Sequence, residues 1–194
     1  MMEAWIGLAG VIVGSFITIS KDTWLSWIER RRSGSYAAIR LTSTLEEYAD
    51  KCIDVVLDDG TAYGQPAGRT DDGQEYHADQ VKLPAPPDYP DDIEWRSLNE
   101  PLMHRVLALP NMARSTDRYI DIAAEHAFPP HYEEAFEARQ KGYAHLGLEA
   151  LETAKELRQH YKINAKGRTD LNDDWDAEAF LRDRLAKLKG TVQP

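Results

Sequence analysis

The sequence predicts an all-α protein, in which a single N-terminal transmembrane helix is followed by a cytosolic bundle of about five helices. Three observations predict this fold class. The segment from Ala4 to Ile19 contains no charged residue, although 29% of the whole chain is charged. Much of the remaining chain repeats its apolar residues every three or four positions, which is typical of amphipathic helices. Residues 61–95 are rich in Pro, Gly and Asp and show no such period, so they predict one long loop.

The uncharged segment predicts the transmembrane helix. It extends about 24 Å as a helix, somewhat less than a hydrocarbon core of about 30 Å, so flanking residues must complete the span. Lysine can extend its ammonium group to the headgroups, and tryptophan favours both membrane interfaces. The residues predicted to anchor the helix are Trp5, Lys21, Trp24, Trp27, Arg30, Arg31 and Arg32. A buried helix of a soluble domain is the competing interpretation, but the glycines in this segment would destabilise such a helix.

The arginine cluster predicts the orientation of this helix. Basic residues next to a span remain on the cytosolic side, so the N-terminus is expected outside and residues 33–194 inside. A cleaved signal peptide would carry its basic residues before the apolar segment instead. We therefore expect a single-pass protein of the plasma (inner) membrane. Its anchor and basic flank are residues 1–32, and one acidic helical domain follows at residues 33–194.

Three glycines share one face of the predicted span. Gly7, Gly10 and Gly14 lie at helical spacing, and the last two form a GxxxG pattern. Such a face lets two membrane helices approach closely, which predicts a homo-oligomer or a contact with another membrane protein. The competing interpretation is chance, because glycine is common in membrane helices.

The cytosolic domain is expected to begin with a helix from Tyr36 to the turn at 58–60. A Ser-Gly-Ser sequence precedes it and either breaks the chain or loosens a longer helix. Asn99 is the predicted N-cap of the next helix. Pro110 is expected to open a third helix, which ends before the Phe-Pro-Pro sequence at 128–130. The apolar positions of this third helix include Met112, Tyr119, Ile120 and Ala123.

Two further helices complete the predicted bundle. The longest runs from His131 to Tyr161, and apolar residues recur along it at every seventh position, which indicates a core-facing seam. The seam consists of Phe136, Tyr143, Ala150 and Leu157. Asp173 is expected to cap the last helix. Its predicted inward-facing residues are Trp175, Phe180, Leu181, Leu185 and Leu188.

Charge and cysteine content exclude several classes of function. The net charge is −10, and an acidic surface repels phosphate backbones, so no nucleic-acid partner is expected. Cys52 is the only cysteine, which excludes an intramolecular disulfide and a cysteine-based zinc site within one chain. It lies on the apolar side of a predicted helix and is interpreted as a buried structural thiol. The common cofactor-binding motifs are absent from the sequence, so no cofactor is expected.

A weak metal-binding pattern flanks the Phe-Pro-Pro sequence. His126, His131 and Glu133 are the candidate ligands, because imidazole and carboxylate groups bind zinc. Their spacing matches no HExxH pattern, and histidines are ordinary at helix ends. The acidic residues at 170–178 alternate as in a calcium loop. They lack its central glycine and final glutamate, so the N-terminus of a helix explains them better.

Four aromatic residues interrupt the otherwise polar and prolyl sequence of the long loop. They are Tyr63, Tyr76, Tyr89 and Trp95. Exposed aromatic side chains in an acidic loop can bind proteins. The preferred interpretation is that Tyr89 and Trp95 instead attach the loop to the bundle.

These observations favour a membrane-tethered, non-enzymatic interaction or regulatory module. Its expected partners are the lipid bilayer and a protein, either a second copy or another membrane protein, that contacts the anchor. Two alternatives stay open. One is a membrane-bound metal-dependent enzyme that uses His126 and His131 with nearby carboxylates. The other is a membrane-perturbing effector, of the toxin or phage-related kind, whose short span acts on the bilayer.

Overall fold

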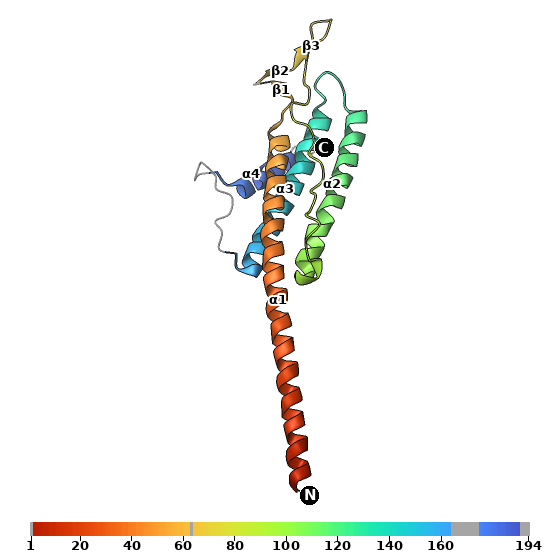
Figure 1. Ribbon diagram of the computed structural model, residues 1–194. Helices are drawn as coiled ribbons and strands as arrows, with labels where there is room; N and C mark the ends of the chain where they lie inside the picture. Colours follow the sequence, from red (N-terminus) through yellow and green to blue (C-terminus); the bar gives the residue numbers. More distant parts are fainter. Residues whose placement is uncertain (1, 63, 164–174, 191–194) are drawn as a thin grey trace.

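The computed structural model describes residues 2–62, 64–163 and 175–190, and describes no side chains at 2–23, 26, 189 and 190. This part of the chain is mostly helical, as the sequence predicts. Its four α-helices are α1 (Met2–Leu57), α2 (Glu100–His126), α3 (Glu133–Tyr161) and α4 (Ala177–Gly190). The bundle occupies one half of the molecule, and the N-terminal half of α1 extends away from it as a single rod (Figure 1).

The first helix is continuous through the Ser-Gly-Ser sequence, so the chain does not break there. At 1.5 Å per residue it is about 84 Å long. Gly34 is buried because the base of the bundle closes around it. A Cβ atom at Gly34 would lie 2.7 Å from the Ser97 carbonyl oxygen and 2.9 Å from the Tyr161 ring. Glycine is thus required here for close packing, and it does not act as a hinge.

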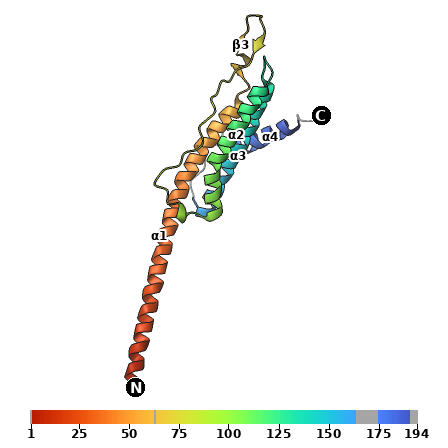
Figure 2. The ribbon, with the colours of Figure 1, turned by 90° about the vertical axis from the view of Figure 1, so that its right-hand side faces the viewer.

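The core lies where α3 packs against the three other helices. The seam predicted on α3 is confirmed: Tyr143, Ala150 and Leu157 are fully buried and Phe136 is 8% exposed. Residues of α1, α2 and α4 complete the core around this seam, among them Leu41, Leu45, Val106, Leu109 and Leu181. A view from the side shows α1, α2 and α3 lying along one another, with α4 projecting from α3 (Figure 2).

Two short hairpins cap the end of the bundle opposite to the α1 rod. Strand β1 (Thr61–Ala62) pairs antiparallel with β2 (Gln65–Pro66), and β3 (Gly68–Arg69) pairs antiparallel with β4 (Glu75–Tyr76). Gly60 turns the chain out of α1 with a φ of 77°, a conformation that favours glycine. The turn predicted at 58–60 is therefore confirmed.

The rest of the long loop returns along the bundle to its base, where a 3-10 turn (Trp95–Ser97) precedes α2. Ile93 and Leu98 are buried, so this loop contributes to the core. Tyr89 and Trp95 form an edge-to-face pair with ring centroids 5.8 Å apart. Both side chains also pack against the hydrophobic core, so their predicted role in attaching the loop to the bundle is confirmed.

The prediction of five cytosolic helices is wrong for the described part of the chain, because the two helices predicted to meet at Pro110 form the single helix α2. Asn99 caps it as predicted, accepting a hydrogen bond from the Leu102 N–H. Pro110 lies inside the helix and has no N–H for the Val106 carbonyl. The Tyr89 hydroxyl donates to that carbonyl instead, at 2.7 Å. The loop therefore satisfies the group that the proline leaves unpaired.

Tyr89→Phe should lower the free energy of unfolding by about 1–2 kcal/mol, because it leaves the Val106 carbonyl without a donor. In a Pro110→Ala background the helix regains its own N–H donor. There, Tyr89→Phe should cost no more than about 0.5 kcal/mol. Urea unfolding of the wild type, the two single variants and the double variant measures the coupling free energy between the two positions. Equal costs of Tyr89→Phe in both backgrounds would contradict the explanation.

The smaller predictions for α4 and α2 have different outcomes. Asp176 caps α4, because its carboxylate accepts from the Ala179 N–H at 3.0 Å. Asp173, the predicted cap, lies outside the described residues. Trp175 is 36% exposed and pairs with the Phe180 ring, so it does not enter the core. On α2, Ile120 is buried, whereas the side chains that lie on its outer surface include Met112 and Tyr119.

Candidate interaction site

One side of α1 carries exposed apolar side chains between the N-terminal rod and the bundle. Leu25, Tyr36 and Ile39 are 45%, 53% and 51% exposed, and Ile28 is half-buried. These four residues define the open face of α1. Residues 3, 8 and 11 positions apart lie close to one another around a helix, so these four side chains share one side of α1. The opposite side of the same helix packs into the bundle through Ala38 and Leu41, among others.

The predicted anchoring residues divide between positions with and without described side chains. At the anchoring residues Trp5 and Lys21, and at the predicted helix contacts Gly7, Gly10 and Gly14, the structure describes only the backbone of α1. Trp24 and Trp27 are 65% and 55% exposed. The guanidinium of Arg31 lies 5.4 Å from the centre of the Trp27 ring, and all three arginines of the cluster are exposed. The flank is thus both aromatic and basic.

In the part of the chain whose side chains the structure describes, no helix is both long and apolar enough to cross a membrane. The side chains of the uncharged segment at 4–19 are not part of it.

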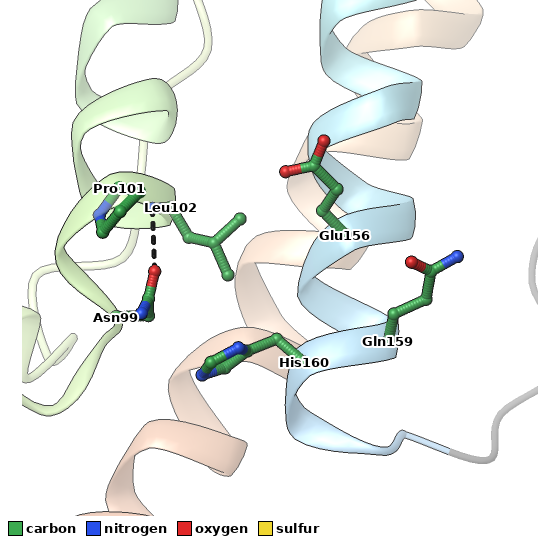
Figure 3. A pocket seen from close by; sticks show the side chains of 6 residues that line it. All are labelled: Asn99, Pro101, Leu102, Glu156, Gln159 and His160. Atoms are coloured by element: carbon green, nitrogen blue, oxygen red, sulfur yellow. Dashed lines mark hydrogen bonds between the residues drawn. The ribbon is translucent and has the colours of Figure 1, made fainter.

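A pocket of about 450 Å³ lies at the base of the bundle, between the start of α2 and the end of α3. Figure 3 shows Leu102 and His160 projecting into it from these two helices, with the Asn99 cap at its edge. Glu156 and Gln159 supply its remaining polar groups. The pocket holds a carboxylate, an amide and an imidazole, and a cysteine or serine nucleophile is not among its lining residues.

Acidic residues of α3 converge beside this pocket on a single arginine. Arg105 of α2 pairs with Glu149 at 2.8 Å and with Glu156 at 2.6 Å. Its half-buried guanidinium is partly desolvated, which lowers the pKa. The hydrogen bonds and charges of these two carboxylates outweigh that effect, and the pKa of Arg105 is raised. Arg105 therefore stays charged and fixes α2 on α3 near the base.

The candidate metal ligands are placed at the far end of the bundle. His126 ends α2, and Glu133 begins α3, and both are exposed. His131 pairs with His77 of the loop, with ring centroids 4.9 Å apart. No group of three or more histidine, cysteine, aspartate or glutamate side chains in the described part of the chain could hold a metal ion. The sequence contained no signal for the pairing of His77, because it depends on how the loop folds back.

A buried ion pair fixes the same end of the bundle. The Arg139 guanidinium of α3 lies 3.0 Å from the Asp58 carboxylate, and both residues are buried. It also donates to the Val81 carbonyl at 2.7 Å and pairs with Asp79. Asp58 in turn accepts from three backbone N–H groups of the turn and loop. This cluster joins the end of α1, the loop and α3. Its charged groups therefore stabilise the fold.

The single cysteine is buried, as the sequence predicts. Cys52 is fully buried between α1 and α3, with Gly147 packed against its Cβ atom. Burial raises the pKa of the Cys52 thiol, so the reactive thiolate is disfavoured. Cys52 is a packing residue.

Comparisons with known proteins found no matching family model, no matching curated protein and no matching solved structure.

Proposed function

We propose that this protein is a membrane-tethered interaction module, in which the N-terminal part of α1 crosses the bilayer and the bundle lies on the cytosolic side. The observation that carries the proposal is the continuity of α1. The same helix includes the uncharged segment at 4–19, the aromatic and basic flank, and the side chains Leu41 and Leu45 of the bundle core.

The environment of the α1 rod supports a role in the membrane. An isolated helix is only marginally stable in water, and most helices are stabilised by packing. The part of α1 before the base of the bundle extends alone (Figure 1) and carries the exposed Trp24 and Trp27. A bilayer supplies apolar surroundings for the uncharged segment, an interface for the tryptophans and anionic headgroups for the arginines.

We also propose a regulatory role for this module, from the way that α1 joins the bundle. The base closes around Gly34 without a flexible linker. A partner that binds the anchor thus also sets the orientation of the bundle, and the acidic surface of the bundle favours basic over acidic partners.

The tether is tested by membrane fractionation of the full chain. The wild-type protein should remain in the membrane pellet after washes with high salt and alkaline carbonate. Ile12→Arg together with Val13→Arg should release most of it, because each arginine costs about 2.5–3.5 kcal/mol at the centre of a span. A chain that begins at Ser33 should be soluble and should retain the helical circular dichroism of the bundle.

Ile39→Arg provides the matched control, because Ile39 is an exposed position on the same helix beyond the proposed span. It should leave the protein in the pellet. A wild-type chain that the washes release as readily as the double variant would refute the tether. A fluorescent reporter that matures only in the cytosol, fused to the C-terminus, should be active if the orientation is right.

A further inference from the structure

We infer that α4 is a displaceable cover, and that the surface beneath it also binds a basic amphipathic helix of a partner protein. This docking surface is the side of α3 around Gly147, next to Cys52 of α1. The inference rests on the proposed interaction role of the bundle but not on the membrane tether. The structure shows one occupant of the surface, α4 itself, and thereby the pattern that a second occupant must match.

A single line of apolar side chains docks α4. Ala177, Leu181 and Leu185 recur at every fourth residue, so they share one side of the helix, and all three are buried. Gly147 allows the middle one to approach closely. A Cβ atom at Gly147 would lie 3.1 Å from the Leu181 Cδ1 atom and 3.0 Å from the Cys52 Cβ atom. Leu181 therefore packs against α3 close to the buried thiol.

Exposed ion pairs flank this apolar line. Arg182 pairs with Glu152 of α3 at 2.5 Å, and Glu178 pairs with Lys155 of α3 at 3.0 Å. Both basic side chains are 55% exposed. Water competes for such pairs, so they contribute little to the stability of docking. They can nevertheless select the charge of whichever helix lies on the docking surface.

One polar contact of α4 reaches further into the bundle. The Arg184 guanidinium donates to the Gln140 side-chain oxygen at 2.6 Å. The Gln140 amide donates in turn to the Asp58 carbonyl at 2.9 Å. The buried Nε of Arg184 has no acceptor among the described residues, and such a donor opposes docking. Docking thus depends mainly on the two leucines, and α4 should open while α1, α2 and α3 stay folded.

Charge indicates the kind of partner. α4 carries four basic and two acidic residues, although the whole chain has a net charge of −10. The docking surface presents Glu152 and the Gln140 oxygen to two of these basic residues, Arg182 and Arg184. A matching partner helix has a small residue and two leucines at every fourth position, with arginines between the leucines. Because α4 is attached to the bundle, its high effective concentration makes it autoinhibitory.

The first test uses Cys52, the only cysteine, as a reporter of opening in the purified full chain. Leu181→Ala should raise the rate at which a maleimide modifies Cys52 at least ten-fold, because it weakens the cover. Leu109→Ala is the matched control, since Leu109 is also fully buried but lies on α2. It should change the rate less than two-fold. An equal rise in both variants would mean that only global unfolding exposes the thiol, and would overturn the inference.

The second test fills the docking surface with a separate helix. Leu181→Asp should displace α4 in the full chain and expose Cys52. A peptide of residues 175–190 should then slow the modification of Cys52 at least ten-fold. The same peptide with Leu181→Asp should not protect, and one with Arg182→Glu and Arg184→Glu should protect at least five-fold less.

Three outcomes of the second test would overturn the inference. They are no protection by the native peptide, equal protection by the altered peptides, and loss of the helical circular dichroism of the whole bundle in the Leu181→Asp chain. The last would show that α4 is an integral part of the core.

Membrane fractionation separates this inference from the tether. The Leu181→Asp chain should remain in the membrane pellet, because the substitution lies outside α1. A pelleted chain that the peptide does not protect contradicts the displaceable cover alone. A chain that the washes release but the peptide protects contradicts the tether alone.

Discussion

Replacing Arg139 with methionine should destabilise the bundle by about 3–5 kcal/mol, which is the usual cost of breaking a buried ion pair. Methionine preserves most of the apolar stem, so the loss reports on the charge. The Asp58 carboxylate would stay buried without a cation, while the Val81 carbonyl would lose its donor. Asp79 contributes little to this cost, because its side chain is 58% exposed and water can replace the arginine.

Urea unfolding of the chain that begins at Ser33, followed by circular dichroism, measures this loss. Arg69→Met is the matched control. Arg69 pairs with Glu75 at 2.7 Å, but the two side chains are 71% and 47% exposed, so its removal should cost less than about 1 kcal/mol. Comparable losses in the two variants would show that Arg139 is not a structural centre.

Replacing Tyr143 with alanine should cost about 3–5 kcal/mol, because it empties the middle of the core. Tyr143 is fully buried and lies on α3, the helix that contacts α1, α2 and α4. Its hydroxyl donates to the Asp117 carboxylate of α2 at 2.6 Å. Burial, and then this carboxylate, raise the pKa of the Tyr143 hydroxyl, so it remains a donor throughout the physiological range.

Tyr143→Phe separates the ring from the hydroxyl. Asp117 is only half-buried and can be hydrated when the hydroxyl is removed, so this variant should lose about 1 kcal/mol. Thermal unfolding of both variants provides the comparison. A Tyr143→Phe variant as unstable as Tyr143→Ala would mean that the hydrogen bond, and not the packing of the ring, dominates at this position.

Local periodicity predicted the parts of the fold that depend on one helix at a time. The seam through Tyr143 and Leu157 follows from seven-residue spacing, and the Asn99 cap follows from its side-chain chemistry. The path of the loop could not be predicted in this way. The carbonyl that Pro110 leaves without a helical donor is paired by the Tyr89 hydroxyl, which is distant in sequence. The partners of Arg139 are equally non-local, and nothing marked it as buried on a polar stretch of α3.

The candidate site was predicted only in part. The exposed tryptophans and arginines of the flank, with the glycine pattern, were visible in the sequence. The open face was not, because Tyr36 and Ile39 look like ordinary core residues until α3 is seen to cover the opposite side of α1. The pairing of His131 with His77, and not with His126, likewise required the fold of the loop.

Because no linker interrupts α1 at Gly34, a rotation of its N-terminal part would also turn the bundle. If that part crosses a bilayer, as we propose, its orientation in the membrane would set the direction in which the hairpins point. Tilting such a rod by about 10° would sweep its far end through roughly 15 Å, given a helix of about 84 Å. Each residue added to the exposed part of the rod would instead rotate the bundle by about 100° relative to the anchor. The number of residues in this rod therefore determines the angle between its two ends about the helix axis, as well as the distance between them.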